Sequence, residues 1–371
     1  MKANTKYILF FLGFLVLLTV SVPSLHINKA QDEAIDIYHL GNSQVSWNVS
    51  EYINFIGPPI DISNPHHLEV FRIVIDDKDP NYNWSKIAVE KEWCTDSGVK
   101  WDPYISEGLY IDAKSDGGGI YIKSTNKHFI FRNCRVNKSG IKGHDAGVLF
   151  RWAENGVIKD NIFTSTRIGI WVQFACWNIL VSGNYIIGNT SMLPRAFNVD
   201  NNCYNVTYSK NVVFNCHSGM YASRTVLKLK ILNNYVANFV YKEWEDAPIY
   251  LSEVSGAQIN YNTLNGVYAK LGVFTEVIGG GNNTIINNTL VSPYAVDIPD
   301  IPILSDGPKL HSSDRCGIGL QECYNNLVAH NLVIKRDSDT AIAGYDVLLT
   351  VSLVGIVGTI LVIKLRIRKL T

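Results

Sequence analysis

The residues that could carry out chemistry are few and lie scattered along the chain. Asp200, Arg224 and Glu253 are candidates for acid–base catalysis, and His144 is directly followed by Asp145. Glycoside hydrolysis needs two carboxyl groups about 5 to 5.5 Å or about 6.5 to 9.5 Å apart. Polysaccharide lysis needs a base near a positive charge that neutralises a uronate. The alternative for His144 and Asp145 is a solvated loop, so catalysis depends on residues that only the fold could bring together.

A second set of residues combines aromatic rings with hydrogen-bonding side chains at regular spacing. Strand alternation places both kinds on the outward side of one predicted sheet face. The candidate ligand-binding residues on this face are Tyr121, Arg151, Trp171, Gln173, Asn198, Asp200, Tyr221 and Tyr250. Sugar C–H groups pack on rings while hydroxyl groups bond polar neighbours, so such a face suits a polysaccharide. The alternative is that these rings, which are good strand formers, only cover the sheet.

A repeat marked by asparagine must position these residues. The asparagine recurs at intervals of 23 to 28 residues, with a last interval of 43, at Asn133, Asn161, Asn184, Asn211, Asn234, Asn262, Asn288 and Asn331. An apolar or aromatic residue stands three positions before every one of them. Another apolar residue stands two positions after all but the first, where Arg135 is found. A second strand-like segment precedes each asparagine, and short β-rich repeats of this length predict a stacked solenoid.

The sequence therefore predicts an all-β chain folded as a right-handed parallel β-helix, with coils about 4.8 Å apart. The coils resemble the parallel β-helix repeat of NosD-like proteins and of carbohydrate-binding and sugar-hydrolase β-helices. The segment Trp101–Ile105, leading to Leu109–Asp112, resembles the start of β-helix domains in archaeal surface proteins. The resemblance covers about residues 101–335 and is specific for fold but weak for function.

The same resemblance raises two activities that the residues do not support. Polygalacturonase-like β-helices carry Asn-Thr-Asp, Asp-Asp and Gly-His-Gly motifs, whereas this chain offers Gly143-His144-Asp145, and its Asp76-Asp77 lies outside the recognised coils. NosD-like proteins suggest copper, but the chain has three methionines and scattered histidines rather than clusters of soft ligands. We expect no metal and no cofactor.

The seven cysteines suggest one crosslink between coils. Cys176 and Cys203 each lie eight residues before a repeat asparagine. They should therefore stack on adjacent coils, at a separation that a disulfide accepts. A second bridge between Cys316 and Cys323 would close the last coil. The alternative is a set of free thiols stacked in the core, and the sequence leaves open the pairing of the remaining three: Cys94, Cys134 and Cys216.

The ends of the chain predict a membrane-anchored, extracellular protein. Val347–Ile363 is uncharged and is followed at once by four cations, as in a single transmembrane helix with a cytoplasmic tail. Tyr7–Val22 is apolar and short, which favours a signal peptide over an uncleaved anchor. The expected organisation is a signal or anchor at 1–30, an N-terminal cap at 31–100, the β-helix at 101–335, a stalk at 336–346, the transmembrane helix at 347–363 and a basic tail at 364–371.

The charge balance limits the partners. The chain has 33 Lys and Arg residues against 33 Asp and Glu residues and carries no basic stripe, so nucleic acid is excluded as a partner. The sequence predicts a cell-surface binding or structural protein that presents an elongated face to glycans or envelope partners. The alternative is an anchored polysaccharide lyase or glycoside hydrolase that acts on the same face.

Overall fold

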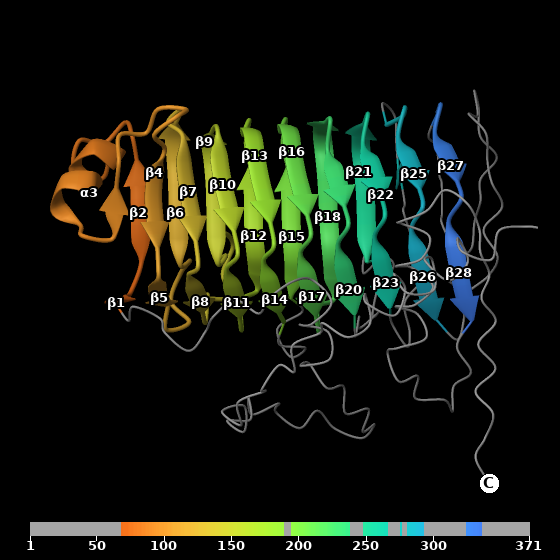
Figure 1. Cartoon of the computed structure of the whole chain (residues 1–371), viewed down its shortest axis with the longest axis horizontal. Helices are drawn as coiled ribbons and strands as arrows, with labels where there is room; N and C mark the ends of the chain where they lie inside the picture. Colours follow the sequence, from red (N-terminus) through yellow and green to blue (C-terminus); the bar gives the residue numbers. More distant parts are fainter. Residues whose placement is uncertain are drawn as a thin grey trace, which may run out of the picture. The chain divides into compact units, whose positions relative to one another are not determined.

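The computed structural model of the chain describes residues 68–188, 194–237, 248–265, 275–276, 280–292 and 324–335. These residues form a solenoid in which strands of successive coils pair side by side, as Figure 1 shows. The strands lie in three columns, which we call columns A, B and C, and each internal coil from β6 to β26 contributes one strand to each column. Every pairing between successive coils is parallel, and the short β3 (Cys94–Thr95) pairs antiparallel with β4 at the N-terminal end.

Columns A and B belong to one continuous hydrogen-bonded sheet that turns a corner. Column A contains β2 (Ile73–Asp76), β6 (Ile120–Thr125), β9 (Val148–Ala153), β12 (Ile168–Gln173), β15 (Arg195–Asp200), β18 (Ser218–Leu227), β21 (Ile249–Ser255) and β24 (Thr275–Glu276). Column B contains β4 (Tyr104–Glu107), β7 (Phe129–Arg132), β10 (Gly156–Lys159), β13 (Trp177–Ser182), β16 (Tyr204–Ser209), β19 (Lys230–Leu232), β22 (Gln258–Asn260), β25 (Thr284–Ile286) and β27 (Leu327–Ala329).

Column C is a separate sheet that closes the coil. It contains β1 (Leu68–Val70), β5 (Leu109–Asp112), β8 (Arg135–Asn137), β11 (Ile162–Thr164), β14 (Tyr185–Ile187), β17 (Val212–Phe214), β20 (Tyr235–Ala237), β23 (Thr263–Asn265), β26 (Thr289–Ser292) and β28 (Leu332–Lys335). The predicted parallel β-helix architecture is confirmed by this topology.

The core is built from the inward side of all three columns. Ile120 and Ile122 are buried on β6 and align with Val148 and Phe150 on β9, as the alternation predicts. The single described helix, α3 (Trp84–Glu90), covers the N-terminal end of this core. Its Trp84 is fully buried, with its ring centroid 5.1 Å from those of both Tyr104 and Phe129.

A buried asparagine ladder runs along the turn between columns B and C. In each step the Oδ1 of one asparagine accepts both the backbone N–H and the side-chain N–H of the asparagine one coil earlier, as between Asn211 and Asn184. The ladder contains Asn161, Asn184, Asn211, Asn234, Asn262, Asn288 and Asn331. Seven of the eight predicted repeat asparagines are therefore confirmed as successive coils of one stack.

The eighth repeat asparagine was assigned wrongly by one residue. Asn133 is exposed at a left-handed corner with a φ of 53°, and Cys134 stands at the ladder position instead. The backbone N–H of Cys134 donates to Asn161 Oδ1 at 2.9 Å. This shift also explains the Arg135 exception, because Val136 is the buried residue that aligns with Phe163.

The predicted domain boundary at residue 101 is also too late. β1 pairs with β5 and β2 pairs with β6, so the solenoid already includes Leu68–Asp76. Part of the predicted cap is therefore a coil, and α3 with its flanking loops forms the covering. Among the described residues no helix is long and apolar enough to cross a membrane. The predicted signal segment, transmembrane helix and basic tail lie outside the described residues.

Candidate functional site

The outward side of column A holds all eight predicted ligand-binding residues. Strand register aligns Trp171 with Asn198, Asn198 with Tyr221, and Tyr221 with Tyr250 on successive coils. A second outward row, displaced by two residues along the strands, aligns Lys123, Arg151, Gln173, Asp200, Ser223 and Ser252. We call these two rows the column A face.

The predicted exposure of the column A face is wrong for most of its length. Trp171 is 8% exposed, Asn198 is 4% exposed and Tyr250 is 2% exposed, whereas Tyr121 and Tyr221 are partly exposed. Trp171 and Leu149 pack with Ala146 and Ile168 in a small apolar cluster of their own. Period-2 alternation predicts which side of the strand a residue lies on, but it does not predict what covers that side.

Asp200 lies at the centre of this face and is held by its neighbours. Trp171 Nε1 donates to Asp200 Oδ2 at 3.0 Å, and Asn201 Nδ2 donates to Asp200 Oδ1 at 2.5 Å. Burial raises the pKa of the carboxyl, and these hydrogen bonds with the nearby Arg224 charge only partly oppose it. Both oxygens are already accepting hydrogen bonds, which favours a positioning role over direct attack on a substrate.

Two polar atoms on the neighbouring coils are buried without a hydrogen-bond partner among the described residues. The first is the donor Arg151 Nη2, and the second is the acceptor Asn198 Oδ1. The Arg151 guanidinium is fixed at its other end, because Nε donates to Gln173 Oε1 at 3.0 Å. Its carbon Cζ lies 5.2 Å from the Phe174 ring centroid. The unpaired donor of Arg151 thus lies one coil before Trp171 and Gln173, and the unpaired acceptor of Asn198 lies one coil after them.

The two ends of the face combine aromatic rings with cations. Arg195 Cζ lies 4.3 Å from the ring centroid of Tyr221, which also stacks on Tyr250 at 5.0 Å with an interplanar angle of 12°. At the other end Lys123 Nζ lies 5.6 Å from the Tyr121 centroid and 2.9 Å from Asp76 Oδ2. The hydrogen bond to Asp76 raises the pKa of Lys123 and engages its charge within the protein.

The predicted catalytic carboxyl groups come from three different elements: the loop before β9, the end of β15, and β21. The Asp145 carboxylate accepts the backbone N–H of Lys142 at 2.8 Å within its own loop. Glu253 follows Ser252, which aligns through Ser223 with Asp200, so Glu253 belongs to a coil two steps away. Arg224 is exposed and is close enough for its charge to lower the Asp200 pKa in part.

His144 reaches the column A face from the loop between β8 and β9. Its ring centroid lies 5.5 Å from that of Trp171. Burial, followed by the Arg151 charge, lowers the pKa of His144. The guanidinium of Arg167 fixes this loop by donating from Nη1 to the Gly143 carbonyl at 2.9 Å. The His144 ring therefore covers Trp171, and its pKa depends on the charge of Arg151.

The structure places the two cysteines of the predicted crosslink on adjacent coils and holds both of them as thiols. Cys176 and Cys203 lie at the same position of adjacent coils, since Tyr204 N–H donates to the Cys176 carbonyl at 3.0 Å. Both are buried free thiols, as are Cys94, Cys134 and Cys216. Burial raises the pKa of Cys134 to about 12, so this thiol remains protonated and unreactive. Cys316 and Cys323 lie outside the described residues.

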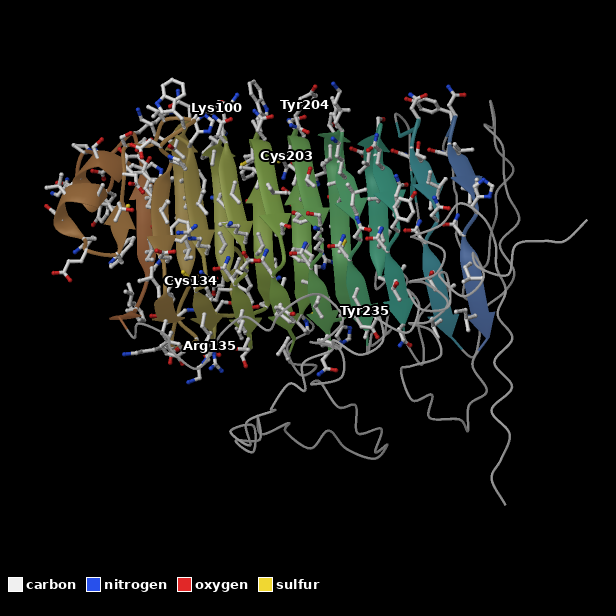
Figure 2. The ribbon with its side chains drawn as sticks, viewed as in Figure 1. Lys100, Cys134, Arg135, Cys203, Tyr204 and Tyr235 are labelled. Atoms are coloured by element: carbon white, nitrogen blue, oxygen red, sulfur yellow. The ribbon has the colours of Figure 1, made fainter. Side chains whose placement is uncertain are left out.

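A groove at the corner between columns A and B was missed by the sequence reasoning. Its volume is about 520 Å³, and it is lined by Asp77, Lys78, Asn83, Ser85, Ser124, Thr125, Asn126, Lys127, Trp152 and Glu154. Tyr204 lies at this edge of the solenoid, opposite the edge that carries Arg135 and Tyr235, as Figure 2 shows. The available signal was that Trp177 and Tyr204 each stand seven residues before a ladder asparagine.

Metal binding receives no support from the described residues. Within the described ranges, no three His, Cys, Asp or Glu side chains are grouped so that they could hold an ion.

Comparisons with known proteins define the class of fold. A protein-family model described as a right handed beta helix region matches residues 105–236. The solenoid is therefore a right-handed β-helix, as predicted. No curated protein is similar enough to this sequence to count as a match.

Four solved chains are similar to this one. One is the DFA-IIIase from Arthrobacter chlorophenolicus A6, in a crystal structure without its lid. The sequences are 10% identical and the TM-score is 0.39. The match covers 72% of this chain and 66% of that enzyme, just under two thirds of the enzyme's length. At this similarity the enzyme's activity carries no argument about the present chain.

Proposed function

We propose that this chain is a glycan-binding β-helix protein whose column A face binds an acidic sugar unit of a polysaccharide. The observation that carries the proposal is the pair of buried, unpaired atoms Arg151 Nη2 and Asn198 Oδ1. Buried polar atoms nearly always have a hydrogen-bond partner, so each such exception needs an explanation. A sugar that carries both a carboxylate and hydroxyl groups would satisfy the donor and the acceptor together.

The charge of the face favours an anionic sugar. Arg151 lies on the face, and Arg224 is close enough for its charge to act on Asp200, the carboxyl group at the centre of the face. Lys123 and Asp76 neutralise each other in an ion pair at the N-terminal end. Guanidinium groups bind carboxylates through paired hydrogen bonds, so a uronate is the sugar class that this face fits best.

Access to this face requires movement of the loop between β8 and β9, whose His144 lies over Trp171. Loops open at a smaller free-energy cost than paired strands do. The partly exposed rings of Tyr121 and Tyr221 flank the covered region and offer entry points on both sides. Binding is then expected to be slow to reach equilibrium, because the loop must open before the ligand contacts Arg151.

The cell-surface part of the proposal rests on the amino-acid sequence. Val347–Ile363 is uncharged and is followed by Lys364, Arg366, Arg368 and Lys369. Such a segment anchors a chain in a membrane with the cations on the cytoplasmic side. The β-helix would then lie outside the cell, where polysaccharides are its available partners.

The alternative is an anchored polysaccharide lyase or glycoside hydrolase that uses the same face. It is favoured by the raised pKa of Asp200, because a general acid must hold its proton near neutral pH. It is opposed by the two hydrogen bonds that already occupy the Asp200 oxygens. We therefore place binding first.

The test is titration calorimetry of the full-length protein, kept in mild detergent, with polygalacturonate oligomers. Replacing Arg151 by Met keeps an unbranched aliphatic stem but removes the guanidinium group and its charge, and should weaken binding at least roughly tenfold. The control Arg132→Met removes a partly exposed arginine of column B that pairs with Glu107. This control should bind as the unaltered protein does.

Each other outcome has a definite meaning. Equal loss in both arginine variants, or no binding of any acidic oligomer, rules out the column A face as the site. Appearance of reducing ends or of unsaturated products during the titration would replace the binding proposal by the enzymatic one.

A further inference from the structure

The groove at the corner between columns A and B is already formed in the folded protein. One wall is the loop between β2 and α3, and the other is the corner where β6 and β9 leave column A. The Asp77 carboxylate joins the two walls, because one oxygen accepts from Thr125 Oγ1 and the other accepts the Trp84 backbone N–H. The groove is thus fixed by contacts between residues distant in sequence, so ligand binding would cost little free energy for ordering its walls.

Trp152 presents one free ring face to this groove. Its side chain lines the groove, and the residue is 52% exposed. The opposite face of the indole stacks on Phe174, with ring centroids 5.6 Å apart and an interplanar angle of 16°. The Phe174 ring also lies 5.2 Å from the Arg151 guanidinium carbon, so the ring on which the indole stacks is itself held by a second contact.

The position of Trp152 is costly for a tryptophan. Its φ is 50°, in the left-handed region, as are those of Ser124 and Asn201 at the equivalent corners of other coils. A side chain with a Cβ pays about 1 kcal/mol or more in this region, and asparagine or glycine pays least. Phe174 has the same left-handed conformation at the equivalent corner of the next coil and stacks on the indole, so the half-exposed remainder of the Trp152 ring is left to contact a ligand.

The polar lining identifies the ligand as an uncharged sugar. Ser85, Ser124 and Asn126 offer hydroxyl and amide groups, and the charges of the remaining lining residues cancel as two acids against two lysines. A flat aromatic face beside neutral donors and acceptors suits the C–H face and hydroxyl groups of a hexose. The column A face, by contrast, has the unpaired guanidinium donor of Arg151.

A row of exposed side chains continues the groove along the solenoid axis. Glu154 of the groove pairs with Trp177 on the next coil, and Trp177 pairs with Tyr204 on the coil after that. Trp177 is 48% exposed and Tyr204 is 36% exposed. With coils about 4.8 Å apart, the row extends the groove by about 10 Å, which is long enough for further sugar units.

From these observations we infer that the corner groove is a second carbohydrate site, which binds a neutral oligosaccharide with one sugar ring stacked on Trp152 and the chain directed towards Trp177 and Tyr204. The inference does not depend on the column A face, because different residues and a different ligand charge carry it.

The experiment titrates the full-length protein with four neutral hexasaccharides, built from glucose, N-acetylglucosamine, mannose or galactose, up to roughly millimolar concentration. At least one should bind and change the tryptophan fluorescence. Trp152→Ala should weaken that binding at least roughly tenfold, through loss of ring stacking. The matched control is Trp101→Ala, which removes an 87% exposed tryptophan that does not line the groove.

Two further variants separate the groove from the column A face and test its length. Asn198→Ala should leave neutral-sugar binding unchanged while reducing polygalacturonate binding. Trp177→Ala should weaken binding of the hexasaccharide more than binding of the matching disaccharide. Failure of all four sugars to bind, or equal affinity of the unaltered protein and Trp152→Ala, would overturn the inference without touching the proposal for column A.

Discussion

Asp200 is a carboxyl group that the fold forces into a buried position, and this should make stability depend on pH. Burial raises its pKa above the ordinary value of 3.8, so the folded state holds the proton more tightly than the unfolded state. Stability from this group is therefore greatest below pH 3.8 and falls as pH rises through the raised folded-state pKa. The variant Asp200→Asn has no carboxyl group to ionise at this position. The free energy of unfolding of the variant, compared with that of the unaltered protein at the same pH, should therefore increase from acid to neutral pH.

Urea unfolding of both proteins across this pH range measures the effect. The same substitution at exposed Asp116 controls for loss of a negative charge as such, and should give a difference that changes less with pH. If the difference in unfolding free energy between Asp200→Asn and the unaltered protein stays constant or decreases towards neutral pH, burial does not raise the Asp200 pKa.

Sequence reasoning at this scale found which residues face outward but not how they are covered. Alternation placed Trp171, Asn198 and Asp200 on the outer side of column A, and strand register confirms it. Trp171 is covered by His144, whose loop is held by long-range contacts such as that of Arg167 with Gly143. No local pattern encodes such a contact. The hydrogen bond from Trp171 to Asp200 was missed for the same reason.

At the scale of the element, the asparagine ladder should contribute much of the stability. Asn211 is fully buried, and its Nδ2 donates to the Val181 carbonyl and to Asn234 Oδ1. Its Oδ1 accepts two N–H groups of Asn184. Asn211→Ala leaves several of these buried groups unpaired, so we expect a loss of about 3 kcal/mol or more in the free energy of unfolding.

Asn133 provides the matched control for that substitution. Sequence pattern places it in the same column, but it is exposed at a left-handed corner, where glycine is well tolerated. Asn133→Gly should therefore change the unfolding free energy by less than about 1 kcal/mol. Comparable losses in Asn211→Ala and Asn133→Gly, measured by chemical denaturation, would show that the buried ladder has no special role.

The misassignment of Asn133 shows where periodicity reaches its limit. The repeat asparagine was found by its spacing, and a neighbouring asparagine one residue from the true position fits nearly as well. Arg135 was the one exception to the apolar residue two positions after each repeat asparagine, and it lies in the coil where the asparagine was misassigned. Cys134 occupies the ladder position without side-chain amide bonds, so the ladder ends at this coil because the residue type changes.

At the scale of the whole molecule, the solenoid is an array in which each coil contacts its neighbours, as the pairings of columns A, B and C show. Stability of such an array is approximately a sum over coils and the interfaces between them. Internal coils are therefore interchangeable for folding, while the two proposed sites each belong to particular coils. The proposed site on the column A face includes β15, whereas the corner groove is built from the ends of β2, β6 and β9 and the loop before α3.

Removing one whole coil should separate folding from function. Deletion of residues 184–210 removes the 27 residues between two ladder positions and joins Gly183 to Asn211. Asn161 could then bond Asn211 directly, and β12 could pair with β18 in the existing parallel register. We expect a β-rich circular dichroism spectrum and cooperative unfolding at a lower temperature. Removal of half a coil, residues 184–197, breaks the register of every later strand and should abolish folding.

The same coil deletion discriminates between the two sugar sites. It removes Asn198 and Asp200, so binding of acidic oligomers should be lost altogether. It leaves Asp77, Trp152 and Trp177 in place, so a neutral disaccharide should bind with little change in affinity. The longer neutral oligomer should bind more weakly, because Tyr204 is gone from the row along the corner. Loss of all sugar binding in a folded deletion variant would mean that both ligands share one site on column A.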